Sequence, residues 1–65
     1  MVLSFTPKII DILRQNGFEF YRAGKGDHQI WRHKETGKRV TVDAKVLSRH
    51  TANKIMRDAG LPKAF

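Results

Sequence analysis

The chain opens with apolar residues at the spacing of one helical face. Apolar side chains between Ile9 and Leu13 form a single stripe, and Pro7 suits the first helical position, where no intrahelical hydrogen bond needs its N–H. Thr6 is a candidate side-chain cap, and Gly17 follows the stripe as a helix-ending glycine. The pattern therefore predicts a helix of about ten residues between them.

Three strand-like segments follow this helix. Residues 18–22 are rich in aromatics. Residues 28–33 contain the apolar pair Ile30-Trp31, and residues 39–42 alternate between polar and apolar side chains. Glycine-containing stretches over residues 23–27 and 34–38 separate them. Three strands joined by two short loops predict an antiparallel meander.

A second helix is predicted near the C-terminus. Apolar residues recur at helical spacing over residues 52–59, and Ser48 before them is a candidate cap. Gly60 is placed to end this helix, and Leu61 falls where it would touch Met56 in a Schellman-type ending.

The order helix, strand, strand, strand, helix predicts an α+β fold, α-β-β-β-α, with a three-stranded antiparallel sheet. Both helices are expected on one face of the sheet, where they bury a single core. A chain of 65 residues leaves room for one domain, spanning residues 1–65. Residues 43–47, between the third strand and the second helix, fit neither a strand nor a helix pattern.

The sequence leaves two alternatives for which face of the sheet meets the core. In the first, Phe20 and Ile30 face the core together with the valines of the third strand. Tyr21 and Trp31 then lie on the outer face, because side chains alternate along a strand. In the second, the faces are swapped and Trp31 belongs to the core. Exposed aromatics beside Arg and Lys are suited to stacking on bases or to filling a partner's pocket.

Charge is the first indication of function. Thirteen Lys and Arg against six Asp and Glu give a net charge of +7. Residues 1–22 hold three basic and two acidic groups, a net of +1, whereas residues 23–65 hold ten and four, a net of +6. Such a surface attracts polyanions, nucleic acid above all. The alternative is that the positive surface only keeps a small protein soluble.

Three features that the sequence lacks indicate the cellular compartment. The sequence contains no cysteine, which favours a reducing compartment over a secreted, disulfide-bonded domain. No apolar run approaches the roughly 18 residues of a membrane span. The first residues show neither the charged segment nor the apolar segment of a signal peptide. We therefore expect a cytoplasmic protein that does not bind membranes.

Neither a metal nor a cofactor is expected. The six acidic residues are spread one per predicted element, and His28 and His33 fall on opposite faces of one strand. No glycine-rich loop leads from a strand into a helix. An enzyme acting on nucleic acid without metal is best suited to RNA, whose 2′-hydroxyl is a built-in nucleophile. Histidine, with an ordinary pKa of about 6.5, can accept its proton near pH 7.

Position selects His28 as the candidate catalytic residue. It follows a loop whose backbone N–H groups and one lysine could hold a phosphate, and Asp27 could orient the imidazole. The alternative is that the glycines only make a hairpin turn and His28 is an ordinary residue at the start of a strand. His50 is expected to be a solvated surface residue. The candidate RNA-binding residues are Arg22, Gly24, Lys25, Gly26 and Arg32.

Together these motifs resemble the HicA toxins, the RNA-cleaving halves of bacterial HicA–HicB toxin–antitoxin pairs. The likeness extends from Ile9 to Leu61, and its specificity lies in the order and spacing of the motifs. These are Gly17-Phe18, Gly26-Asp27-His28, Ile30-Trp31-Arg32-His33, Val40-Thr41-Val42 and Ala59-Gly60-Leu61.

The resemblance implies a fold like that of a double-stranded-RNA-binding domain. It also implies cleavage of messenger RNA, growth arrest, and neutralisation by a HicB-like antitoxin that covers the basic active face. The family's catalytic histidine lies in a Gly-Ser/Asp-His element, which here assigns the role to His28. Many members have a Pro and a second His after the third strand, where this chain has Asp43-Ala44-Lys45. The other function to weigh is a non-catalytic RNA-binding module of the same shape.

Overall fold

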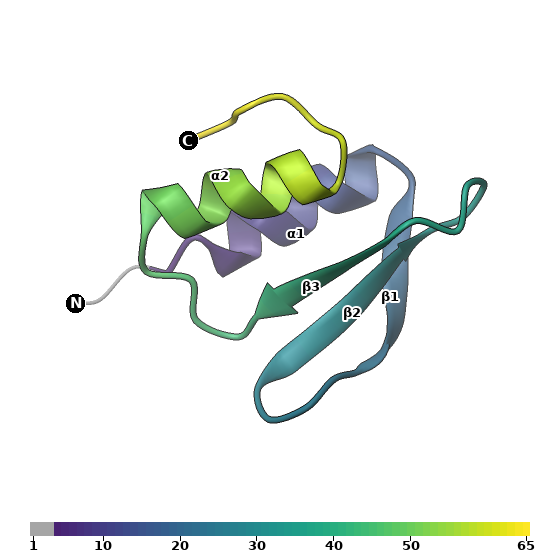
Figure 1. Ribbon diagram of the computed structural model, residues 1–65, viewed down its shortest axis with the longest axis horizontal. Helices are drawn as coiled ribbons and strands as arrows, with labels where there is room; N and C mark the ends of the chain where they lie inside the picture. The colour runs from purple at the N-terminus through teal and green to yellow at the C-terminus, as the bar shows by residue number, and fades with distance from the viewer. Residues whose placement is uncertain (1–3) are drawn as a thin grey trace.

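The computed structural model describes residues 4–65 and confirms the predicted α-β-β-β-α order (Figure 1). Each predicted strand agrees with the observed one to within a residue at either end. The elements are α1 (Thr6–Gln15), β1 (Phe18–Ala23), β2 (His28–His33), β3 (Arg39–Asp43) and α2 (Arg49–Asp58).

The three strands form one antiparallel sheet in the order β1-β2-β3, as the meander predicted. β2 is therefore central, and its register pairs His28 with Asp43 and Arg32 with Arg39 on β3. The register of β1 against β2 shifts between Phe20 and Arg22. This bulge leaves Tyr21 without a cross-strand partner and locally bends the strand.

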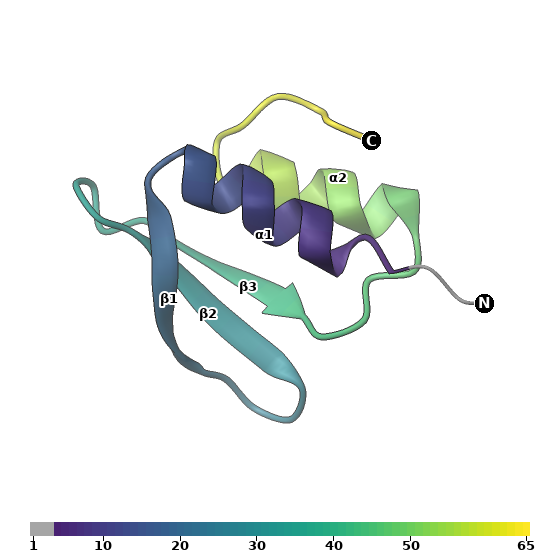
Figure 2. The same cartoon turned by 180° about the vertical axis from the view of Figure 1, so that it is seen from behind.

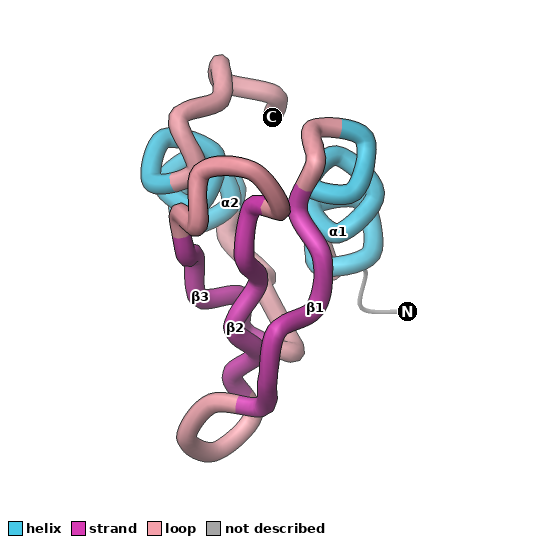
Figure 3. Tube along the Cα trace, turned by 90° about the vertical axis from the view of Figure 1, so that its right-hand side faces the viewer, coloured by secondary structure: helices cyan, strands magenta, loops and turns pink. Residues whose placement is uncertain are grey.

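Both helices cover the same face of the sheet, as expected, so the molecule has two layers and one open sheet face (Figures 1, 2 and 3). α1 packs against β1, and α2 packs against β3. Neither helix in the described part of the chain is long and apolar enough to cross a membrane. The buried core consists of Ile9, Leu13, Phe18, Trp31, Val40, Val42, Val46, Ala52, Ile55, Met56 and Ala59.

Trp31 decides which face of the sheet meets the helices. Its side chain is 2% exposed and packs in the core, so the alternative that placed it on the outer face is wrong. Trp31 is the cross-strand partner of both Phe20 and Val40, which brings these three side chains to the helix side. Ile30 consequently lies on the open face. The largest apolar side chain of the sheet takes the covered side because its burial removes the most apolar area from water.

Thr6 was predicted to cap α1, and that prediction is wrong. The N-cap residue is Phe5, and Ser4 Oγ accepts the hydrogen bond of the Thr6 N–H at 3.0 Å. The buried Thr6 hydroxyl instead donates to the Asp43 carbonyl and accepts from the Val46 N–H, both at 3.0 Å. Thr6 thereby ties the start of α1 to the segment that follows β3.

The predicted limits of α2 are confirmed. Ser48 Oγ accepts a hydrogen bond from the Thr51 N–H at 3.4 Å, so Ser48 is the side-chain cap. At the other end, the Gly60 N–H donates to the Arg57 carbonyl and the Leu61 N–H donates to the Met56 carbonyl, both at 2.9 Å. These bonds satisfy carbonyls that the last helical turn leaves free.

Candidate active site

The side chains of His28 and Asp43 are in contact on the open face of the sheet. The two residues are direct cross-strand partners on β2 and β3, and His28 Nε2 lies 3.0 Å from Asp43 Oδ1. His28 is three positions before the buried Trp31, so the pleat turns its side chain away from the helices. The side chains are 51% and 44% exposed, which leaves the pair open to a large substrate.

The backbone of Asp43 is held from two directions. Its carbonyl accepts the Thr6 hydroxyl proton, and the next residue, Ala44, donates its N–H to the Asp27 carbonyl at 3.0 Å. Asp27 immediately precedes His28. The end of β3 is thus joined to the turn that carries His28, which fixes the two partners relative to each other.

A tight turn positions His28 itself. The Gly24 N–H donates to the His28 carbonyl at 2.8 Å, and the His28 N–H donates to the Lys25 carbonyl at 3.3 Å. A Cβ at Gly24 would lie 3.2 Å from His28 Cβ, so a side chain there would crowd His28. Gly26 has a φ of +65°, a left-handed conformation that L side chains rarely adopt. Both glycines therefore have a role in the turn.

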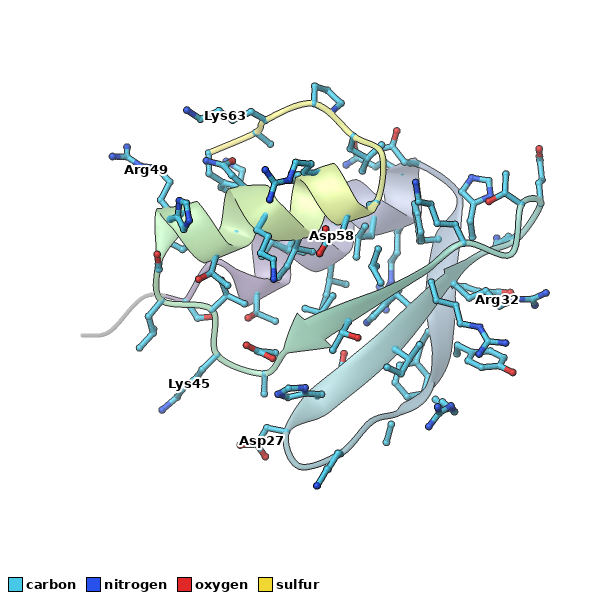
Figure 4. All side chains as sticks on the ribbon, in the orientation of Figure 1. Asp27, Arg32, Lys45, Arg49, Asp58 and Lys63 are labelled. Carbon is cyan, nitrogen blue, oxygen red and sulfur yellow. The ribbon has the colours of Figure 1, made fainter. Side chains whose placement is uncertain are left out.

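The predicted RNA-binding residues divide into two groups. Arg22, Lys25 and Gly26 are exposed around the turn, close in the chain to His28, and Lys45 adds an exposed cation at the same end (Figure 4). The Gly24 amide is already engaged within the turn. Arg32 lies on the same face as His28 but four residues further along β2, which is about 13 Å away.

Sequence reasoning missed the residue that lies against His28. Asp27 was the expected partner, yet it is the Asp43 carboxylate that lies against the imidazole. The signal was present in the hairpin that joins residues 28–33 to residues 39–42. Extending its antiparallel register by one residue brings position 43 opposite His28.

The other two histidines have different surroundings. His33 Nδ1 accepts hydrogen bonds from the Glu35 and Thr36 N–H groups at 3.1 and 3.2 Å, which shapes the turn after β2. Its ring packs edge-on against Phe18 on the helix side, so it lies on the opposite face from His28, as expected. His50 is exposed on α2, also as expected. Within residues 4–65, no three His, Cys, Asp or Glu side chains cluster as a metal site would require.

A groove leads from Asp43 across the edge of the sheet. It has a volume of about 420 Å³ and lies between β3 and α2. Arg39 and Lys54 contribute two cations to its lining, and Thr41 and Thr51 also line it. Asp43 and Asp58 line the same groove, so two carboxylates balance its two cations.

The His28–Asp43 pair has the groups that acid–base chemistry requires. An ionised carboxylate only accepts hydrogen bonds, so a hydrogen bond across this contact has His28 Nε2 as its donor. In a neutral imidazole the other nitrogen, Nδ1, is then unprotonated and can accept a proton. No residue of the described chain makes a hydrogen bond to this nitrogen. The arrangement suits a general base whose tautomer and orientation are set by the carboxylate.

Comparison with models of protein families identifies the family of the chain. Residues 7–61 match the family described as the HicA toxin of bacterial toxin-antitoxin systems. The matched span runs from α1 to the residue after Gly60 and includes both His28 and Asp43. No curated protein and no solved structure matched the chain. Because the match covers most of its length, the chain belongs to the HicA toxin family of bacterial toxin–antitoxin systems.

Proposed function

We propose that this HicA toxin is a metal-independent endoribonuclease that cleaves messenger RNA in the cytoplasm and so arrests growth. In this proposal His28 is the general base and Asp43 holds it in position. The observation that carries the proposal is the exposed Nε2–Oδ1 contact of 3.0 Å on the open face of a basic domain. A surface pair of this kind contributes little to folding, so stability does not account for its close geometry.

The reaction follows from the free nitrogen. His28 Nδ1 takes the proton of an RNA 2′-hydroxyl, and the 2′-oxygen attacks the adjacent phosphorus. The bond from phosphorus to the 5′-oxygen of the next nucleotide breaks, and this oxygen receives the proton back from the imidazolium. The products are a 2′,3′-cyclic phosphate and a free 5′-hydroxyl. General base catalysis of this kind contributes about 100- to 10,000-fold to a rate.

Charge stabilisation comes from the cations around the pair. The phosphorane formed in the attack carries more negative charge than the starting phosphodiester. Lys25 and Arg22 at the turn, together with Lys45, are exposed side chains that can approach it. The Gly26 N–H group at the tip of the turn adds a backbone donor. Donors aimed at developing charge lower the barrier more than donors that bind the ground state equally well.

Replacement of His28 is the direct test. We expect His28→Ala to lose cleavage of single-stranded RNA by about 100-fold or more, while circular dichroism and RNA affinity stay close to the unmodified protein. His50→Ala removes an exposed histidine from α2 and is the matched control, with cleavage unchanged. If His28→Ala still cleaves at the original rate, the assignment fails. An unmodified protein that binds RNA without cleaving it would instead be the RNA-binding module.

Dependence on pH and on chelators tests the mechanism. If one imidazole is base and then acid, the rate depends on its neutral form, so cleavage rises with pH along a single limb and then levels. A bell-shaped profile would show a second titrating group. Cleavage is expected to persist in EDTA, and strong inhibition would contradict a reaction without metal.

The family implies an antitoxin partner, and we propose that a HicB-like protein covers the open face. An acidic surface there would block the approach to His28 and compete with phosphate for Lys25 and its neighbours. We expect added salt to slow association of the two proteins, because salt screens the attraction between their oppositely charged surfaces. A complex in which His28 stays open to solvent would contradict occlusion.

A further inference from the structure

A second group of side chains on the open face has no role in the reaction above. Tyr21 lies against two guanidinium groups, with Arg39 Cζ 4.7 Å and Arg32 Cζ 5.6 Å from the centre of its ring. We name these three residues the Tyr21 cluster. Tyr21 is 43% exposed and is the residue that the β1 bulge leaves without a cross-strand partner.

The Tyr21 cluster and the His28–Asp43 pair lie at opposite ends of the same two strands. Arg32 is four residues after His28 on β2, and Arg39 is four residues before Asp43 on β3, so all four side chains share the open face. The labelled side chains of Asp27 and Arg32 mark the two ends in Figure 4. The separation is about 13 Å along the strands.

The cross-strand pairing of the two arginines works against the Tyr21 cluster. Arg32 and Arg39 are direct cross-strand partners, and like charges placed opposite each other destabilise a sheet. Glu19 is the cross-strand partner of Arg32 on β1, yet neither arginine forms a salt bridge within residues 4–65. Two guanidinium groups held together without a carboxylate are best satisfied by an external anion.

The chemistry of the cluster favours single-stranded RNA. Aromatic rings and guanidinium planes both stack on exposed bases, and guanidinium groups also bind phosphate oxygens. The face between the two ends is thin in apolar side chains, with Ile30 opposite Thr41 at its centre. Polar and cationic side chains therefore dominate this face, as suits a phosphate backbone.

We infer that the Tyr21 cluster binds a base of the RNA substrate, with Tyr21 as the stacking residue and Arg32 and Arg39 on the flanking phosphates. The base lies roughly two to four nucleotides from the scissile phosphate, since a stacked strand rises about 3.4 Å per nucleotide and an extended one more. This inference rests on the proposed function for the position of the scissile bond, but not for the binding of RNA.

The test uses the intact protein carrying His28→Ala, so that RNA is bound but not cleaved. The probes are single-stranded heptanucleotides with 2-aminopurine at one position at a time, whose fluorescence is quenched when the base stacks. In this background Tyr21→Leu is expected to weaken binding by about 5- to 150-fold and to abolish the quenching at one position. Tyr21→Phe keeps the ring and is expected to retain both.

Phe20→Leu is the matched control. Phe20 is the neighbouring aromatic, 51% exposed, and its ring contacts Trp31 on the helix side of the sheet. The substitution removes one exposed aromatic ring, as Tyr21→Leu does, but from the opposite face. RNA affinity is expected to stay within about twofold, and circular dichroism checks that each variant is folded.

The outcomes separate this inference from the proposed function. Equal affinity for Tyr21→Leu and Phe20→Leu overturns the subsite, whether or not the unmodified protein cleaves RNA. If Tyr21→Leu weakens only the binding of an acidic protein partner and not of RNA, the surface is a protein interface and the inference is again wrong. If Tyr21→Leu weakens RNA binding but the unmodified protein never cleaves, the subsite stands and the nuclease proposal fails.

Discussion

The two faces of the sheet differ in what their residues need from the fold. On the covered face, Phe18, Trp31, Val40 and Val42 are between 0% and 4% exposed and pack under both helices. On the open face, the His28–Asp43 pair and the Tyr21 cluster are solvated, and one of them sets two like charges opposite each other. The covered face supplies the free energy of folding, whereas the open face bears groups that folding does not require. Stability and activity should therefore respond to different substitutions.

The largest effect is expected from the covered face. Trp31→Ala removes the largest core side chain and is expected to lower the free energy of unfolding by about 3–5 kcal/mol. Such a loss is close to the whole stability that a domain of this size has, so the variant should be mostly unfolded at 37 °C. Thermal unfolding followed by circular dichroism measures this. A cooperative transition at the original temperature would show that Trp31 is not the centre of the core.

Thr6 links the two faces and is expected to affect both. Thr6→Val keeps the shape but leaves the buried Val46 N–H and the part-buried Asp43 carbonyl without their partner, which costs about 1–3 kcal/mol for the buried N–H. Because the same bond holds the backbone of Asp43, cleavage should fall as well. Thr6→Ser restores the hydroxyl and is the control. Urea unfolding and cleavage are measured together, and a loss of stability with full activity would separate Thr6 from the site.

Asp43 tests the open face alone. Asp43→Ala removes the carboxylate that sets the imidazole, and we expect cleavage to fall by up to about 100-fold, the cost of misplacing a catalytic group. Stability should change by less than about 1 kcal/mol, because the pair is exposed. Asp27→Ala is the matched control, since its carboxylate is not the one beside His28. Equal activity losses in the two variants would indicate that Asp27, in the turn, positions His28 as much as Asp43 does.

The smallest expected effect is an increase in stability. Arg39→Gln removes one of two like charges facing each other and is expected to raise the stability by roughly 0.2–1 kcal/mol. The same change should weaken RNA binding and flatten its dependence on salt, because one phosphate contact is lost. Lys8→Gln, at an exposed position on α1, serves as the charge-matched control. If Arg39→Gln is less stable than the unmodified protein, the guanidinium has a structural role.

Much of this molecule could be predicted from local sequence patterns. The helical stripe before Gly17, the three strand-like segments and the capped second helix gave the element order and the α+β class. His28 could also be singled out, by its place after a glycine turn and by its resemblance to the HicA element. These features depend on residues a few positions apart, where helical and strand periodicity, capping and turn geometry act.

Tertiary structure alone decided the rest. Trp31 took the covered face because both helices meet the sheet there, and periodicity by itself is symmetrical between two faces. Thr6 does not cap α1, because its hydroxyl is hydrogen-bonded to residues 43–47 instead. The sequence pattern assigned no structure to that segment. Asp43 became the partner of His28 through the register of two strands. Such pairings join residues far apart in the chain, so they follow from packing and register rather than from any local pattern.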